Sequence, residues 1–276
     1  MAEPARPLLD DDLLHIRVLV ADCLDIDRSW DARDVRSPYW RFYVNSRDGA
    51  AIALADGLYP LRRGWVHLIP AWVPFSCRNH ERISHLYAHF DPLGMPGALV
   101  RELFPRPLSF APRPGLAQAT TALAKALTER ALNGPALLCQ VKAVIYEALG
   151  LAFAALPAEH LERLAGLAGG RDPLAPALQH IDDHLGEPLA NATLARICGL
   201  SVDHFIRRFH AHVGQTPAQY ILERRVAQAA QRLLFTNETI DAIAESGGFP
   251  DRFYFSRVFA RRMGMGPAAY RKNGRV

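Results

Sequence analysis

The chain has 276 residues, enough for two hydrophobic cores; half of them are hydrophobic and 22% are charged, as in an ordinary globular protein. Its four cysteines lie far apart and form no CxxC pair, which argues against a zinc knot or a disulfide framework. The formal net charge of +4 is uneven: residues 1–170 carry 18 Lys and Arg against 18 Asp and Glu, whereas residues 171–276 carry 14 against 10, so the basic excess lies in the C-terminal part, as in proteins that bind polyanions.

Short apolar segments separated by turn residues run from Leu13 to about Asp91. They include YWRFYVN, AAIALADG, WVHLIP and RISHLYAHF, and several of them alternate apolar with polar residues. Short strands at this spacing predict an antiparallel barrel or sandwich. A proline-rich connection follows over about 91–115.

The hydrophobic period then becomes helical. Residues 116–132 and 135–156 are rich in Ala and Leu, and their apolar positions recur every three or four residues, which predicts two amphipathic helices. Their Ala-rich faces can form a seam between two copies of the chain or cover the barrel, and the sequence leaves both open. Gly169 and Gly170 mark the boundary before the last domain.

The C-terminal part is helical throughout by pattern, which places the chain in the α+β class. Asn191, Ser201 and Asn237 are expected to cap helices, and Thr216 followed by Pro217 predicts the start of a longer one. The predicted helices include 174–185, 192–198, 202–212, 217–235, 250–262 and a short closing helix over 267–272.

Two stretches of this part are versions of one pattern. The first reads LARICGLSVDHFIRRFHAHVGQTPAQY and the second IAESGGFPDRFYFSRVFARRMGMGPAAY. Phe205 aligns with Phe255 and Arg207 with Arg257 at an offset of 50 residues. Each stretch has the pattern of a helix-turn-helix motif, and two such motifs in register predict DNA binding.

The phenylalanines are predicted to face the core, which leaves the opposite side of each recognition helix exposed. Arg207 and Arg257 are predicted to contact a base or a phosphate there, because the planar guanidinium matches guanine O6 and N7. Either arginine could instead be a solvated surface residue. Ile206 and Phe253 are apolar on the same faces, so they contact thymine methyl groups or pack partly into the surface.

The helix between the two motifs gives a geometric check. About 19 residues at ~1.5 Å each span roughly 28 Å, which suits two recognition helices in successive major grooves about 34 Å apart. One chain would then read a non-palindromic site on one face of the duplex. Arg208 and Arg261 are candidate phosphate contacts, which position a protein without specifying sequence.

The stretch from Leu174 to Lys272 resembles the DNA-binding domain of the AraC/XylS family of bacterial transcription regulators. The family's strongest signature stands here as IAESGGFPDRFYFSRVFARRMGMGPAAYR. The resemblance implies base contacts from three positions in each copy: Asp203, Ile206 and Arg207 in the first, and Arg252, Phe253 and Arg257 in the second. The family usually has small or polar residues where Ile206 and Phe253 stand, so these departures alter the target sequence or weaken one reading head.

By similarity to many such regulators, residues 13–110 resemble a cupin-like effector-binding barrel, 116–168 a helical dimerisation or linker region, and 171–276 the DNA-binding domain. In such regulators the barrel binds a small molecule, often a sugar. Aromatic rings for stacking and polar groups for hydroxyls predict an effector site, formed by Trp40, Arg41, Tyr43, Trp65 and His67. The alternative is that the aromatic side chains only fill the barrel.

Several histidines of the barrel, among them His85 and His89, raise the question of a metal. The HxH pair followed by a spaced Glu that metal-binding cupins carry is absent, so neither a metal nor another cofactor is expected. No GxSxG motif, phosphate loop or pair of catalytic carboxylates is evident either. The protein is therefore not expected to be an enzyme.

The sequence thus predicts a dimeric, small-molecule-responsive, sequence-specific activator of the AraC type, whose partners are promoter DNA and RNA polymerase. A cytoplasmic location without membrane contact is expected, because no apolar run of membrane-span length and no hydrophobic signal core is evident. Two alternatives stay open: a cupin-type metal-dependent enzyme fused to a DNA-binding domain, and a constitutive regulator whose barrel only dimerises.

Overall fold

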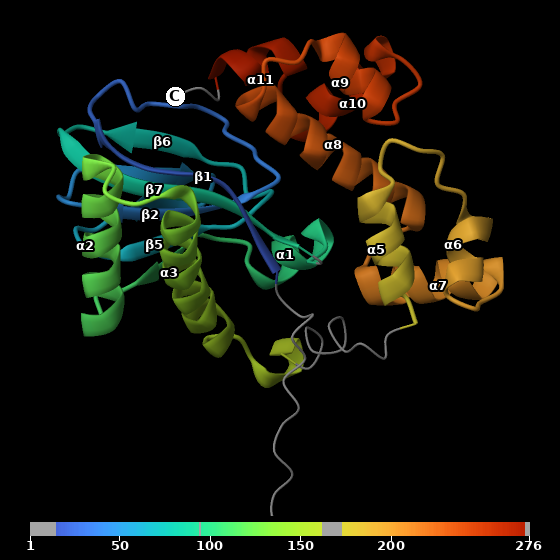
Figure 1. The fold of residues 1–276 in the computed structure, drawn as a ribbon, viewed down its shortest axis with the longest axis horizontal. Helices are drawn as coiled ribbons and strands as arrows, with labels where there is room; N and C mark the ends of the chain where they lie inside the picture. The colour runs from blue at the N-terminus through green and yellow to red at the C-terminus, as the bar shows by residue number, and fades with distance from the viewer. Residues whose placement is uncertain (1–14, 94, 162–172, 274–276) are drawn as a thin grey trace, which may run out of the picture.

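The computed structural model describes residues 15–93, 95–161 and 173–273. An N-terminal part of β-sheets and helices lies beside a C-terminal part of helices (Figure 1). This arrangement confirms the predicted α+β class, with antiparallel strands first and a helical domain last. The predicted domain limits at 13, 168 and 171, and the boundary at Gly169 and Gly170, lie outside the described residues.

The strands form two antiparallel sheets with a hydrophobic layer between them. The larger sheet has the order β1 (His15–Ile26), β7 (Ile83–Leu93), β2 (Trp40–Asn45), β5 (Val66–Ile69) and β8 (Leu108–Phe110). The smaller sheet has the order β4 (Gly57–Pro60), β3 (Ala50–Leu54) and β6 (Ser76–Asn79). The predicted barrel is therefore not one closed sheet, and the two sheets together enclose its interior.

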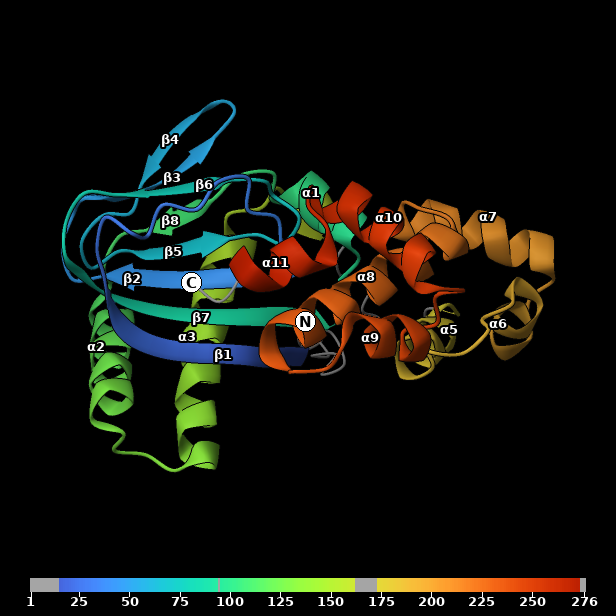
Figure 2. The same cartoon turned by 90° about the horizontal axis from the view of Figure 1, so that it is seen from above.

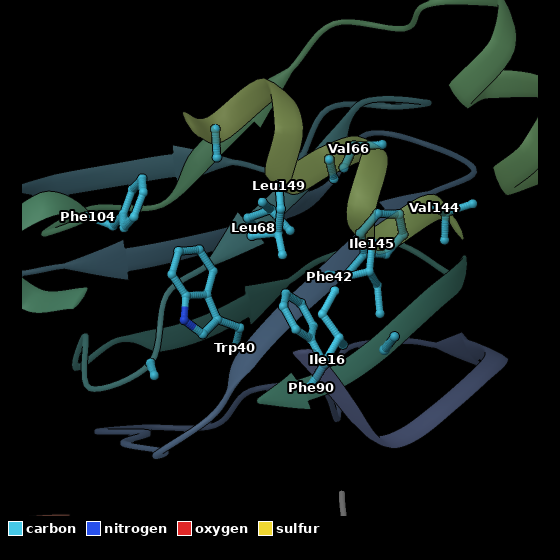
Figure 3. Packing of buried hydrophobic residues seen from close by; sticks show 14 of the residues in the cluster. Ile16, Trp40, Phe42, Val66, Leu68, Phe90, Phe104, Val144, Ile145 and Leu149 are labelled. Carbon is cyan, nitrogen blue, oxygen red and sulfur yellow. The ribbon is translucent and has the colours of Figure 1, made fainter. Parts of the chain in front are cut away.

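Helices α2 (Pro114–Glu129) and α3 (Gly134–Ala154) cover the outer face of the larger sheet (Figure 1). Ile145 and Leu149 of α3 are fully buried and lie over Phe42 of the sheet (Figure 3). Apolar side chains at helical spacing thus meet one face of the strands, as the amphipathic pattern predicts.

Two elements lie within the stretch predicted as a proline-rich connection, namely α1 (Gly97–Leu103) and β8. The buried residues of α1 include Leu99, Val100 and Leu103, which have helical spacing. Pro96 stands just before the first turn, where a missing N–H breaks no helical hydrogen bond. The proline content therefore led to the prediction of an irregular connection, although the apolar spacing indicates a short helix.

Helix α3 has 21 residues, and its most apolar window has a mean hydropathy of 1.6, which makes the helix long and apolar enough to cross a membrane by length and composition alone. The expectation that no apolar run reaches that length is therefore wrong. A core helix passes the same test, and a third of the apolar window, 33%, is buried in the protein. Val144 and Ile145 are among the side chains that face the sheet.

The C-terminal part has two hydrophobic cores, one around Phe205 and Phe209 and the other around Phe255 and Phe259. Its helices are α5 (Ala175–Asp183), α6 (Asn191–Ile197), α7 (Val202–Val213), α8 (Pro217–Phe235), α9 (Ile240–Ser246), α10 (Arg252–Met263) and α11 (Pro267–Asn273). We call the unit up to the start of α8 the first half and the unit from α9 onward the second half. Helix α8 contributes side chains to both cores.

The helix starts match the sequence in part. Ser201 and Thr216 cap α7 and α8 with their side chains, as predicted. The other two cap assignments are wrong: Asn191 is already the first helical residue of α6, and the N-cap of α9 is Thr239 rather than Asn237. Since Thr and Asn are both good caps, composition alone could not choose between them.

Charged residues in α8 join the two parts of the molecule. Glu223 is only 2% exposed, accepts the backbone N–H of Gly97 at 3.1 Å and pairs with Arg101 at 3.2 Å. The next residue, Arg224, lies 3.6 Å from Asp91 of β7. A buried carboxylate requires such partners, so these contacts fix how α8 lies against the N-terminal part.

Buried histidines predict a loss of stability at mildly acidic pH. Burial lowers the pKa of His67 to about 4 and that of His85 to about 3, whereas an unfolded histidine titrates near 6.5. Below about pH 6.5 the unfolded chain therefore takes up protons that the folded chain does not, at about 1.4 kcal/mol per pH unit for each histidine. Urea unfolding at about pH 6.5 and about pH 5 should show this fall, and His85→Gln should reduce its slope. An unchanged slope in the variant would contradict the assignment.

Candidate nucleic-acid interface

Helices α7 and α10 are built alike. Each begins at a side-chain cap, Ser201 or Asp251, and each ends at a glycine, Gly214 or Gly264, with a φ of 78° in both. A positive φ of this size favours glycine because a Cβ would be strained there. The same backbone conformation thus explains why both copies have a glycine at this position.

Paired aromatic rings hold each of these helices on its core. Phe205 and Phe209 are fully buried with ring centroids 5.5 Å apart, and Phe255 and Phe259 repeat this at 5.4 Å. The prediction that these rings belong to the core is confirmed. Because they occupy one side of each helix, the opposite side is left for contacts outside the domain.

In the first copy, three of the predicted contact residues lie at the surface. Asp203, Arg207 and Arg208 are exposed on α7. Ile206 is half-buried and packs against the first core. Only part of its side chain is therefore free to touch a thymine methyl group.

The second copy presents more of its predicted contact residues. Arg252, Arg257 and Arg261 are exposed on α10. Phe253 is 74% exposed, the most exposed of the large hydrophobic side chains among the described residues. The exposed ring is thus available for apolar contact with a thymine methyl group in the major groove.

Asp241 is a residue of this surface that the sequence did not single out. It stands in the first turn of α9 and pairs with Arg252 at 2.9 Å. Both side chains are more than half exposed, so the pair contributes little to stability. The pair places the Arg252 guanidinium beside α9, and only the three-dimensional fold brings the two residues together.

The predicted effector residues do not all share one face. Trp40 is fully buried, and its ring lies 5.2 Å from that of Phe104 on the helix-covered side of the larger sheet (Figure 3). Successive residues of a strand point to opposite faces. Trp40 is thus separated by the sheet from Arg41 and Tyr43.

Arg41, Tyr43 and His67 face the interior between the sheets, where Tyr43 and His67 are paired across β2 and β5. His67 is hydrogen-bonded through Nδ1 to the Ser109 hydroxyl at 2.8 Å. Trp65 lies elsewhere, half-buried at the surface with the Arg62 guanidinium 5.0 Å from its ring. The fold therefore brings three of the five residues to one side.

A cavity of about 270 Å³ lies beside Arg41, between the two parts of the molecule. Its walls come from the segment before β2, from β2, from the end of α8 and from α11, which lies near β2 (Figure 2). The lining includes Asp31, Arg33, Arg36, Tyr39, Arg41, Leu234, Met265 and Tyr270. We call it the interdomain cavity; it is basic on one side and apolar or phenolic on the other.

Within the described ranges, no three His, Cys, Asp or Glu side chains come close enough together to hold a metal ion. His85 and His89 do face the same side of β7, but His85 is hydrogen-bonded to Asn45 at 2.7 Å. The described histidines therefore form no metal centre by themselves.

Comparison with known proteins identifies the C-terminal part. Residues 194–273 match the helix-turn-helix domain family. The MmsAB operon regulatory protein of Pseudomonas aeruginosa is 35% identical over 96 residues, which are 35% of this chain and 31% of that protein. A putative AraC-like transcription regulator of Streptomyces lividans is 37% identical over 120 residues, 41% of this chain and 40% of that protein. The C-terminal part thus matches the helix-turn-helix domain family and is similar to AraC-type regulators, which confirms the predicted resemblance.

The chain matches well under half the length of these relatives. The fold of the whole chain has a counterpart in ToxT from Vibrio cholerae, with a TM-score of 0.55 over 92% of this chain and 97% of that one. At 12% identity this likeness concerns the fold alone. It confirms the arrangement of an N-terminal β part followed by a helical part.

Arg257 provides a test of the exposed face of α10. Arg257→Ala should weaken binding to a specific site by about 1–3 kcal/mol if the guanidinium reads a base, with a much smaller effect on random DNA. Fluorescence anisotropy on both kinds of duplex measures the two losses. Arg82→Ala removes the same charge from an 80% exposed side chain of the N-terminal part and serves as the control. Equal losses on both duplexes would make Arg257 a phosphate contact instead.

Proposed function

We propose that this protein is a sequence-specific transcription regulator of the AraC type that binds promoter DNA through both helix-turn-helix motifs. The observation that carries the proposal is the pairing of α7 and α10, which present exposed arginines at matching positions, Arg207 and Arg257. Helix α8, which connects the two motifs, has 19 residues and is therefore roughly 28 Å long, a length that suits successive major grooves. The proposed base contacts are Asp203, Ile206, Arg207, Arg252, Phe253 and Arg257, with Arg208 and Arg261 on phosphates.

The regulator acts as a dimer in the cytoplasm and recruits RNA polymerase. Leu138 and Tyr146 on α3 are 43% and 39% exposed, which supports a role of the α2–α3 pair as the seam between two copies. Apolar side chains of this size at a surface are typical of association interfaces. The opposite face of α3 packs on the sheet, so the helix can serve both purposes.

Selection of DNA by the full-length chain tests this proposal. Purified protein is mixed with fragmented genomic DNA and random duplexes, and the retained fragments are sequenced. The expected result is enrichment of one non-palindromic site with two elements about 10 base pairs apart, because two major grooves are read from one side. Retention of all sequences alike would refute a specific regulator.

The N-terminal part binds the small-molecule effector in the interdomain cavity. Arg41 is 7% exposed and donates to the Ser37 hydroxyl, and its guanidinium lies 4.8 Å from the Tyr39 ring and 5.0 Å from the Phe75 ring. Within the described chain, no carboxylate forms an ion pair with it. A buried cation without a counter-ion is unfavourable, which favours an anionic effector.

A carboxylate with an apolar tail fits this cavity better than a neutral sugar. The carboxylate would meet Arg41. Arg33 and Arg36 also line the cavity and outweigh Asp31, the one carboxylate among the described lining residues. The tail would lie against Leu234 and Met265. A sugar would leave the buried charge unpaired. One solved ToxT structure contains an unsaturated fatty acid, a ligand of this chemical class.

Because both parts of the molecule line the cavity, an effector there changes how they pack. A ligand that touches β2 and α11 together favours the arrangement in which both elements stay in place. The proposed mechanism is a population shift between this arrangement and one in which the DNA-binding part is less restrained.

Thermal unfolding with small probes tests the effector site. Octanoate should raise the melting temperature of the full-length protein in a concentration-dependent manner, whereas octanol should not, because only the former supplies a negative charge. Arg41→Gln should abolish the octanoate shift, and Arg82→Gln, which alters an exposed arginine, should keep it. A shift with neutral sugars and none with carboxylates would contradict an anionic effector.

A further inference from the structure

Helix α8 passes from one core to the other near Arg225. Tyr220 and Ile221 belong to the first core, whereas Val226 and Ala229 belong to the second. No buried cluster of the described residues spans the two halves at this point. A single helix connecting two separate cores would allow the halves to pivot unless something else joins them.

The side chain of Arg225 makes that connection. Its Nε donates to the carbonyl oxygen of Leu185 at 2.8 Å, and its Nη2 donates to that of Glu187 at 2.7 Å. Both carbonyls belong to the loop between α5 and α6, in the first half. The flat guanidinium with its fixed donor directions suits two acceptors at once, which an ammonium group cannot match.

Two glycines bring the backbones of the two halves into contact around this arginine. A Cβ on Gly186 would lie 2.6 Å from the carbonyl oxygen of Ser246, the last residue of α9. A Cβ on Gly248, whose φ is +72°, would lie 2.6 Å from the Leu185 carbonyl oxygen and 2.8 Å from the Arg225 guanidinium carbon. The turn between α9 and α10 therefore rests directly on the α5–α6 loop.

Side-chain packing does not fill the rest of this junction. An open groove of about 610 Å³ runs beside Arg225, with Pro188 and Leu189 on one wall and Phe249 and Pro250 on the other. Apolar packing across the groove is thus incomplete. The contacts made by Arg225, Gly186 and Gly248, together with the Arg224–Asp182 ion pair at 2.8 Å, therefore restrain the angle between the halves.

We propose that Arg225 is a positioning residue that sets the spacing between the two DNA elements the protein can read. The proposal rests on DNA binding by both motifs. The guanidinium of Arg225 is engaged by the α5–α6 loop, so the role assigned to it is to hold α7 and α10 at one mutual angle. One inserted base pair moves the second DNA element by about 3.4 Å and turns it by about 34°. A protein with a rigid junction would then bind the altered site weakly, whereas one with a flexible junction could adapt to it.

Competition binding with spacing variants of the selected site tests this. Duplexes with one base pair inserted or removed between the two elements are compared with the parent duplex, using the full-length chain. The unaltered protein should lose at least about tenfold in affinity on either variant, the size of loss expected when base contacts in one element are given up. Arg225→Lys keeps the charge but cannot make both hydrogen bonds to the two carbonyl oxygens. It should reduce the loss of affinity on the spacing variants to about threefold or less.

Arg232→Met is the matched control on the same helix. Arg232 bonds to Glu238 and Ser246 in the second half, so its loss should leave the spacing profile as sharp as in the unaltered protein. Gly248→Ala is a second probe, because the added Cβ must push the halves apart; it should shift or broaden the preferred spacing. Melting curves show that each protein compared is folded.

The outcomes separate this inference from the proposed function. No sequence preference in the unaltered protein would refute the regulator itself. A two-element site with no spacing preference, or an equally sharp profile in folded Arg225→Lys and Gly248→Ala, would overturn the role of Arg225 alone. A sharp profile that only these variants broaden supports it.

Discussion

Three consecutive charged residues of α8 hold this structure together. Glu223 fastens the helix to α1, Arg224 pairs with Asp91 of β7 and Asp182 of α5, and Arg225 grips the α5–α6 loop. Because neighbouring positions on an α-helix point about 100° apart, three successive side chains reach three different surfaces. Less than one turn of helix thus relates the N-terminal part and both halves of the DNA-binding part to each other.

The charges at this point specify orientation more than they add stability. Removing ions from water offsets much of the attraction within a buried pair. Asp182 illustrates the balance, since burial raises the pKa of its carboxyl while the adjacent Arg224 opposes the rise. Apolar contacts would tolerate sliding between the parts, whereas ion pairs and directed hydrogen bonds are lost when the parts move. The junction therefore holds the parts in one arrangement until these contacts break, as the proposed population shift requires.

Local patterns predicted the elements, and only long-range contacts could have predicted the junctions. The repeat of Phe205 and Phe209 as Phe255 and Phe259 identified both motifs, because burial of one helix face depends on residues four apart. The opposite orientations of Trp40 and Arg41 also follow from strand alternation. Grouping by residue type placed them in one site, because it did not take this alternation into account. No periodicity places Arg225 beside Leu185, because that contact depends on the path of the loops.

The two recognition helices, α7 and α10, differ in which side chains they expose. In the first, Ile206 packs partly against the core, so Asp203 and Arg207 are the exposed residues among the base contacts proposed on α7. In the second, Phe253 is exposed and Arg252 is held by Asp241, which leaves Arg257 as a cation without such a partner among the described ion pairs. A head with a cation and an anion discriminates mainly by hydrogen bonds, whereas one with an aromatic ring adds apolar contact. If both motifs bind DNA as proposed, unequal recognition helices at a fixed spacing would give the site a direction, and a single chain would distinguish the two orientations of a promoter element.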